Sequence, residues 1–231
     1  MSAPSTSAQL REHAMPVWET LIAHPFPAGI ADATLAPERL RFYLAQNLRY
    51  LPDYARMIAV AASCSVDDAS LQEFTAALVN IVSVEIPENR RLHAAISELS
   101  GEPFALDDVV APATAAYTSW LLATAATGDA VDIAAALLPC AWSYGEIART
   151  HAPTAVQHPV YTQWLAFFAS DDYAAVVDRL IVAFDRDLAT ASEAKRERLA
   201  ELFVTGCRME RQFWDQAFAR SHWPDLVAEL G

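Results

Sequence analysis

The chain has 231 residues with a formal net charge of −13, and 54% of its residues are hydrophobic. This length allows one large domain or two small ones, and the hydrophobic fraction is sufficient for a substantial core. The strong acidity argues against binding to nucleic acid or to an anionic membrane surface. No stretch approaches the roughly 18 uninterrupted apolar residues of a membrane-spanning helix. The first residues also lack the charged and apolar regions of a signal peptide.

The cysteines and histidines do not form a recognisable metal or disulfide pattern. Cys64, Cys140 and Cys207 are odd in number and far apart, unlike a disulfide framework or a zinc motif. We therefore expect a reducing compartment, the cytoplasm. The six histidines are scattered, without the Glu-x-x-His pairs of helical di-iron sites. Phosphate-binding glycine motifs are also lacking, and we predict neither a metal nor a cofactor.

The sequence pattern is helical throughout. Glycine is scarce, with 6 residues, alanine and leucine are abundant, and no segment alternates with the period of a strand. We expect residues 1–6 to be a disordered lead-in and residues 7–231 to form one domain, an all-α bundle of about eight to nine helices. The predicted helices span approximately residues 7–23, 37–62, 70–99, 112–127, 129–150, 161–168, 171–190 and 192–220.

Proline, glycine and capping residues refine these boundaries. Pro16, Pro52 and Pro87 predict kinks, and the cluster from His24 to Pro27 predicts a break. Asp68 or Ser70 is expected to cap the third helix. The residues of that helix expected to face inward are Leu71, Phe74, Leu78, Ile81 and Val82.

The second helix carries two stripes. An apolar stripe runs along it at helical spacing, and beside this stripe lie Tyr43, Asn47, Tyr50 and Tyr54. Such a row could line a polar pocket inside a bundle. It could equally be a helix edge whose tyrosine hydroxyls reach water, and the spacing does not separate these alternatives.

Cys140 and Tyr144 share one helical face, one turn apart. Cys140 follows Pro139, a residue tolerated in the first turn of a helix. A thiol in a first turn lies near the positive end of the helix dipole, which favours the thiolate. The alternative is that Cys140 packs as a small hydrophobic residue.

Glu210 interrupts the apolar face of the last helix, among Phe203, Phe213 and Trp214. A buried carboxylate is costly, so it pairs with another group, raises its pKa or serves chemistry. The alternative is a glutamate at the edge of the stripe that bridges a neighbouring arginine. A thiolate beside a carboxyl group that can be neutralised suits addition to an electron-poor ring with proton transfer to a ring nitrogen.

Several segments resemble the thiaminase II (TenA) family, whose members have a haem-oxygenase-like helical fold. The most specific matches are Pro-Cys-x-Trp-x-Tyr and Glu-x-x-Phe-Trp. The matching segments follow the order and spacing of the family and cover residues 25–35, 43–51, 138–147, 158–164 and 210–215.

The resemblance implies a reaction and assigns roles to several residues. Cys140 would add to the pyrimidine ring of thiamin or a degraded aminopyrimidine, and Glu210 would exchange a proton with a ring nitrogen and bind the exocyclic amine. Cleavage of a C–N bond by water would release hydroxymethylpyrimidine. Family members commonly form homo-oligomers, so a dimer or tetramer is expected. The implied substrate-binding residues are Asn47, Tyr50, Tyr117, Tyr144, Phe168 and Phe213.

Two of these positions depart from the family pattern. Asn47 stands where the family usually has an aspartate that binds the substrate amine, and Phe168 stands where it usually has a tyrosine. The first alternative to a typical hydrolase is therefore an altered substrate or a non-catalytic protein that binds a small heterocycle. A second is an oxidase resembling pyrroloquinoline quinone synthase, against which the scattered histidines count.

Overall fold

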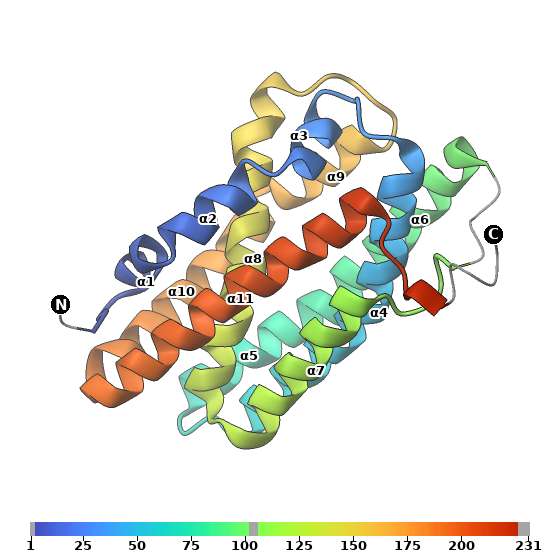
Figure 1. Ribbon diagram of the computed structural model, residues 1–231. Coiled ribbons are helices and arrows are strands. Elements are labelled where there is room, and N and C mark those ends of the chain that lie inside the picture. Colours follow the sequence, from blue (N-terminus) through green and yellow to red (C-terminus); the bar gives the residue numbers. More distant parts are fainter. Residues whose placement is uncertain (1–2, 102–105, 226–231) are drawn as a thin grey trace.

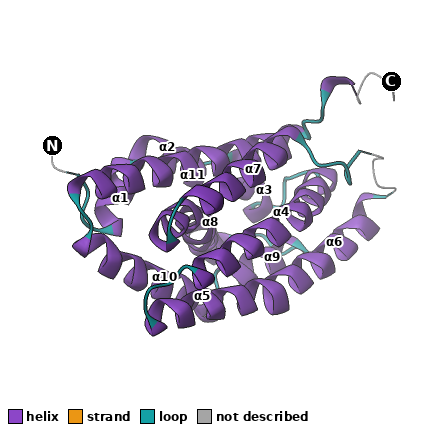
Figure 2. Cartoon of the chain, turned by 90° about the horizontal axis from the view of Figure 1, so that it is seen from below, coloured by secondary structure: helices purple, strands orange, loops and turns teal. Residues whose placement is uncertain are grey.

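The computed structural model describes residues 3–101 and 106–225, and every regular element in these ranges is a helix (Figure 2). The all-α prediction is confirmed. Predictions for residues 1–2, 102–105 and 226–231 lie outside the described residues. The elements are α1 (Ser7–His13), α2 (Met15–Ile22), α3 (Pro25–Ala31), α4 (Pro37–Ser63), α5 (Asp68–Asn80), the π-helical turn η1 (Ile81–Glu85), α6 (Ile86–Ser100), α7 (Pro112–Thr127), α8 (Ala130–His151), the 3₁₀ turn η2 (Ala152–Thr154), α9 (Tyr161–Phe168), α10 (Asp171–Thr190) and α11 (Glu193–Ala219).

The helix count agrees with the prediction once interrupted helices are treated as single rods. Helices α1 and α2 are separated only by Ala14, and η1 joins α5 directly to α6. Counted in this way, the described part of the chain has nine helices. The helix that the sequence did not predict is α3. It begins at Pro25, which suits a first helical position, and the His24 ring accepts a hydrogen bond of 3.0 Å from the Phe26 N–H.

Most helix ends follow the local signals. Pro37 and Pro112 begin α4 and α7, and Gly101, with a φ of +75°, ends α6. The predicted cap of α5 is wrong by a residue or more. Asp67 caps this helix through a 2.8 Å bond from the Ser70 N–H.

Three long helices form the centre of the bundle. Helix α11 packs mainly on α8, and α4 packs against α5, α6, α7 and α8. Figure 1 shows α11 crossing α8, with α2 and α7 on its two sides. Helices from distant parts of the chain therefore meet around one core.

The inward face of α5 differs from the prediction. Leu71 and Val82 are exposed, at 44% and 50%. The inward positions Ser70 and Ala77 each lie one residue before the predicted Leu71 and Leu78. The buried residues along α5 and η1 are Ser70, Phe74, Ala77, Ile81 and Glu85.

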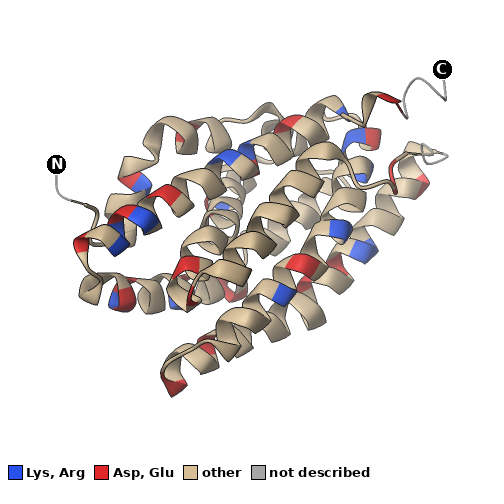
Figure 3. Ribbon diagram, turned by 60° about the horizontal axis from the view of Figure 1, so that its bottom comes forward, with Lys and Arg blue, Asp and Glu red and all other residues tan. Residues whose placement is uncertain are grey.

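Charged residues of both signs are interspersed along the helices (Figure 3). A few are buried. Arg41 pairs with Asp107 at 2.8 Å, with both side chains almost fully covered. Glu85 and Glu210 are buried, and no ion pair of either is seen in the described residues. Among the described helices, none is long and apolar enough to cross a membrane.

Candidate active site

Cys140 lies in the middle of α8, and the prediction that it occupies a first turn is wrong. The helix begins ten residues earlier, where Asp129 and Asp132 form a reciprocal capping box. The helix dipole acts only within the first turn, so it does not activate this thiol. Burial and then the negative charges of Glu210 and Glu85 raise the pKa of Cys140 well above its usual value. The resting thiol is therefore protonated.

Gly206 allows α11 to approach α8 beside this cysteine. A Cβ atom at Gly206 would lie 2.9 Å from Pro139 Cγ and 3.1 Å from the Ala136 carbonyl oxygen. Any larger residue would therefore push the helices apart. The tight contact places the Cys140 segment of α8 against the Glu210 segment of α11.

Glu210 is 1% exposed, so the alternative of a surface glutamate bridging an arginine is wrong. Tyr117 Oη donates a hydrogen bond of 2.7 Å to Glu210 Oε1. Burial raises the pKa of Glu210 to about 7, against the opposing effects of donors on Tyr117 and Cys140. The carboxyl group thus lies near the thiol and can hold or release a proton near neutral pH.

A pocket opens beside Cys140 between α4, η1, α8 and α10. Its free space suffices for a few water molecules, so a six-membered ring requires side chains to shift. A second, more apolar cavity lies beyond Tyr54 and Leu180, which line both spaces. Neither arginine, lysine nor histidine lines the first pocket. Its polar and aromatic lining consists of Asn47, Tyr54, Asn80, Glu85, Cys140, Tyr144 and Tyr173.

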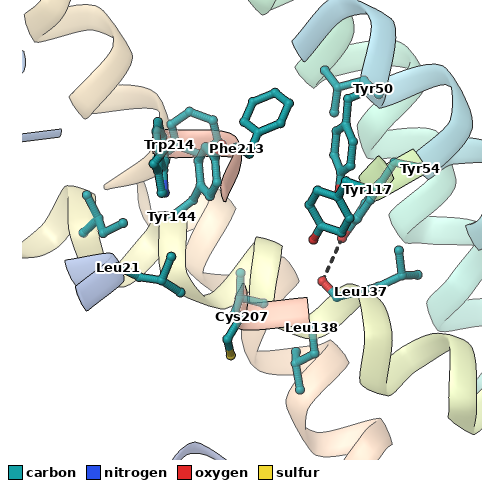
Figure 4. Close-up of a cluster of buried hydrophobic side chains, with 14 of the residues drawn as sticks. Leu21, Tyr50, Tyr54, Tyr117, Leu137, Leu138, Tyr144, Cys207, Phe213 and Trp214 are labelled. Carbon is teal, nitrogen blue, oxygen red and sulfur yellow. Dashed lines mark hydrogen bonds between the residues drawn. The ribbon is translucent and has the colours of Figure 1, made fainter. Parts of the chain in front are cut away.

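Aromatic rings cover the Glu210 side of the site. The Tyr50 ring centre lies 4.9 Å from that of Tyr117 and 5.7 Å from that of Phe213. Tyr144 packs against Trp214, with ring centres 5.0 Å apart. Figure 4 shows these rings together, with Tyr54 reaching the carbonyl oxygen of Leu137. The hydroxyl of Tyr50 is buried and has no well-formed hydrogen bond among the described residues, although it lies near enough to Cys140 to lower the pKa of the thiol slightly against the larger effect of burial.

Phe168 lies behind Tyr144 and does not line the pocket. It is 1% exposed, and its ring centre is 4.9 Å from those of Tyr144 and Trp164. Of the residues predicted to bind substrate, Asn47 and Tyr144 line the pocket, while Tyr50, Tyr117 and Phe213 form the aromatic group beside Glu210. Phe168 is in a position to support Tyr144.

Asn47 is fixed by a neighbouring amide. Its Nδ2 donates a 2.9 Å hydrogen bond to Asn89 Oδ1, and Asn89 Nδ2 donates to the carbonyl oxygen of Glu85, also at 2.9 Å. The second stripe of α4 therefore lines a pocket at this position, as one of the two alternatives predicted. The same amides tie α4 to the π-helical turn.

The sequence interpretation missed Glu85. This residue is 7% exposed and lines the pocket with Cys140. Burial and then the charge of Glu210 raise the pKa of Glu85 to about 7. A signal was present, because Glu85 follows the inward Ile81 by four residues in an apolar run. The reasoning that selected Glu210 applies equally to Glu85.

Groups of three or more histidine, cysteine or acidic residues arranged to hold a metal ion do not occur in the described part of the chain. The expectation that the protein holds neither a metal nor a cofactor stays a prediction. The chemistry available from the described side chains is nucleophilic addition by a thiol and proton transfer by carboxyl groups.

Known proteins resemble this chain over most of its length. The sequence profile of the TENA/THI-4/PQQC family matches residues 11–220. Proteins named aminopyrimidine aminohydrolase from Halalkalibacterium halodurans and Helicobacter pylori are 35% and 32% identical, over 95% and 92% of this chain and 98% of theirs.

Solved structures share the fold. A TenA homologue from P. horikoshii superimposes with a TM-score of 0.78 at 27% identity, covering 92% of this chain and 98% of that one. A domain with a haem-oxygenase-like fold from Shewanella denitrificans gives a TM-score of 0.69 at 13% identity, covering 92% of each chain. The second match concerns the fold alone, and it confirms the predicted haem-oxygenase-like architecture.

Proposed function

Because the chain belongs to the TENA/THI-4/PQQC family and is homologous to aminopyrimidine aminohydrolases, we propose that it hydrolyses an aminomethylpyrimidine. The products are hydroxymethylpyrimidine and ammonia, as in thiamin salvage. The observation that carries this proposal is that the Cys140 thiol and the Glu210 carboxyl group, from tightly packed segments of α8 and α11, lie close enough in a buried, aromatic site for each to shift the pKa of the other. A nucleophile and an acid–base group in contact are what addition to a heteroaromatic ring requires.

In the proposed reaction, Cys140 and Glu210 act as one unit. The sulfur forms a C–S bond to a ring carbon, and the thiol proton passes through Glu210 to a ring nitrogen. The electron pair gained by the ring then expels the amine, already protonated, from the exocyclic carbon as ammonia. Water adds to that carbon and its surplus proton is released with the ammonia. The C–S bond then breaks, and the proton on the ring nitrogen returns through Glu210 to the sulfur. Moving a proton within the pair adds no net charge to a buried site, where charge is costly.

The surrounding residues would bind and orient the ring. Tyr50, Tyr117 and Phe213 offer faces and edges for aromatic packing, as does Tyr144 across the pocket. Asn47 can accept a hydrogen bond from a ring amine through its Oδ1, because its Nδ2 is committed to Asn89. This accounts for an asparagine where the family usually has an aspartate, although the negative charge is lost.

A non-catalytic heterocycle-binding protein is the second candidate, because Asn47 removes a charge from the pocket. Product formation separates the two. We expect the unsubstituted protein to release hydroxymethylpyrimidine and ammonia, Cys140→Ser to release neither, and Cys64→Ser, the same change at an exposed cysteine, to retain activity. Turnover by Cys140→Ser would refute the mechanism. Tight calorimetric binding by the unsubstituted protein without product over hours would favour the binding protein.

We further propose that the protein acts in the cytoplasm as a homodimer or homotetramer. Several apolar side chains on α5 and η1 support an interface because they are exposed: Leu71, Val79, Val82 and Val84. Sedimentation of the purified chain tests the assembly, and a monomer at micromolar concentration would contradict it.

A further inference from the structure

Glu85 is a buried acid without a partner in the described structure. Glu85 is only 7% exposed. Among the described residues, neither a hydrogen bond nor an ion pair to its carboxyl group is found, whereas its backbone oxygen accepts from Asn89. Buried carboxylates usually have a partner, because desolvation of an unpaired charge is costly. An unpaired one that faces a pocket is ready to receive a ligand group.

The pocket around Glu85 lacks a counter-charge. Its lining includes Cys140 and Asn47 but neither lysine, arginine nor histidine. The nearby Glu210 already accepts from Tyr117 and contacts Cys140. Glu85 is therefore the carboxyl group of the described pocket lining, and its side-chain oxygens have no partner among the described residues.

We propose that Glu85 binds the leaving amine of the substrate as an ammonium ion, a role that rests on the proposed hydrolase function. The two carboxyl groups then divide the work. Glu210 exchanges a proton with the ring nitrogen, and Glu85 holds the group that departs from the exocyclic carbon. When the C–N bond breaks, the bonding electrons pass to nitrogen. The amine can therefore leave as neutral ammonia only if it is protonated to ammonium before the bond breaks. A carboxylate beside the amine keeps it in the ammonium form before that step.

Glu85 is the last residue of the π-helical turn η1. It lies on the same inward face as Ile81 and lines the pocket with residues of α8, and π-turns inside α-helices occur often at functional sites. The Asn47–Asn89 bonds hold the backbone of the turn, since Asn89 donates to the Glu85 carbonyl oxygen. Asn47 would then contribute hydrogen bonding and position, and Glu85 would contribute the charge.

Binding measurements with two ligands test the proposal without turnover. In a Cys140→Ser background, calorimetry compares aminomethylpyrimidine, which carries the ammonium, with hydroxymethylpyrimidine, which does not. We expect Glu85→Gln to weaken binding of the aminomethylpyrimidine roughly 10-fold or more, as for a lost charge-assisted hydrogen bond. The affinity for hydroxymethylpyrimidine should be nearly unchanged. Glu88→Gln, which removes the partner of Arg91 on the surface of α6, is the matched control and should affect neither ligand.

The possible results separate the two proposals. Equal effects of Glu85→Gln on both ligands, or no effect on the amine, would overturn the role of Glu85 while leaving hydrolysis intact. A parent protein that neither binds nor hydrolyses the amine would overturn both. Glu85→Leu, which replaces the carboxyl group with apolar volume, provides the same comparison if the glutamine variant does not fold.

Discussion

Tyr117 donates a 2.7 Å hydrogen bond to Glu210 and thereby links α7 to the acid–base group on α11. Both residues are almost fully buried, at 1% exposed. The bond favours the charged form of the acid and opposes the effect of burial on its pKa. This contact therefore sets the pH at which Glu210 can accept the thiol proton.

Replacing Tyr117 with phenylalanine should raise the pKa of Glu210 above its value of about 7. A hydrogen bond to a charged group is worth about 1.5–3 kcal/mol, so we expect a rise of roughly one unit or more. The acid limb of the pH profile of kcat/KM should move to higher pH by the same amount. Tyr161→Phe, which removes a remote hydroxyl bonded to the Leu35 carbonyl oxygen, is the control. An unshifted profile for Tyr117→Phe would contradict the role of this bond.

Glu85 and Glu210 should make the protein less stable as pH rises. The pKa of each is raised from 4.5 to about 7 in the folded state. The folded state thus binds their protons more tightly than the unfolded state. The stability that each contributes is complete below pH 4.5 and is lost as pH rises through about 7. Each shift corresponds to roughly 3 kcal/mol.

Urea unfolding on both sides of this window measures the effect. The free energy of unfolding of the unsubstituted protein should fall from the acidic to the alkaline buffer. For the double variant Glu85→Gln/Glu210→Gln, this fall should be smaller by several kcal/mol. Parallel pH dependences for the two proteins would show that these carboxyl groups ionise in the folded protein as they do in solution.

The thiol of Cys140 should react slowly with an alkylating agent despite its proposed role. Its pKa is raised by burial and by the charges of Glu210 and Glu85, and the thiolate is the reactive form. Peptide mapping after brief treatment with iodoacetamide at neutral pH should show the exposed Cys64 modified first.

Glu210→Gln should speed the alkylation of Cys140, because it removes a negative charge and an acceptor for the thiol proton. Rapid modification of Cys140 in the unsubstituted protein would instead indicate an activated thiolate, as the first-turn prediction implied.

Substituting Gly206 with alanine should destabilise the protein and slow the reaction. The added Cβ would meet Pro139 at 2.9 Å and backbone at 3.1 Å. Overpacking of this kind costs about 1–3 kcal/mol, which exceeds or matches the roughly 1 kcal/mol that alanine gains over glycine in a helix. The separation of α8 and α11 should also lower kcat.

Gly145→Ala is the matched control for this substitution. Its added Cβ meets flexible arginine atoms and Tyr173 no closer than 3.4 Å, so it should be neutral or stabilising in thermal unfolding. A stabilised Gly206→Ala with full activity would show that the close approach of the helices is not required.

The fold class, most helix ends and the principal candidates of the site could be predicted from the amino-acid pattern. Helical periodicity carries this information, because burial of one face repeats every turn, and prolines and glycines act locally on the backbone. Glu210 could be recognised because a charged residue interrupted an apolar stripe. The family resemblance supplied the chemistry of Cys140.

Tertiary structure decided what depends on contacts between distant segments. Pro139 suggested a first turn at Cys140, although Asp129 already marked the start of this helix, and packing keeps α8 continuous through Pro139. Packing of η1 against α4 brought Glu85 to the pocket. The protonation of Cys140 follows from charges on α11 and η1, because electrostatic coupling in a buried site depends on distance in space and not on separation along the chain.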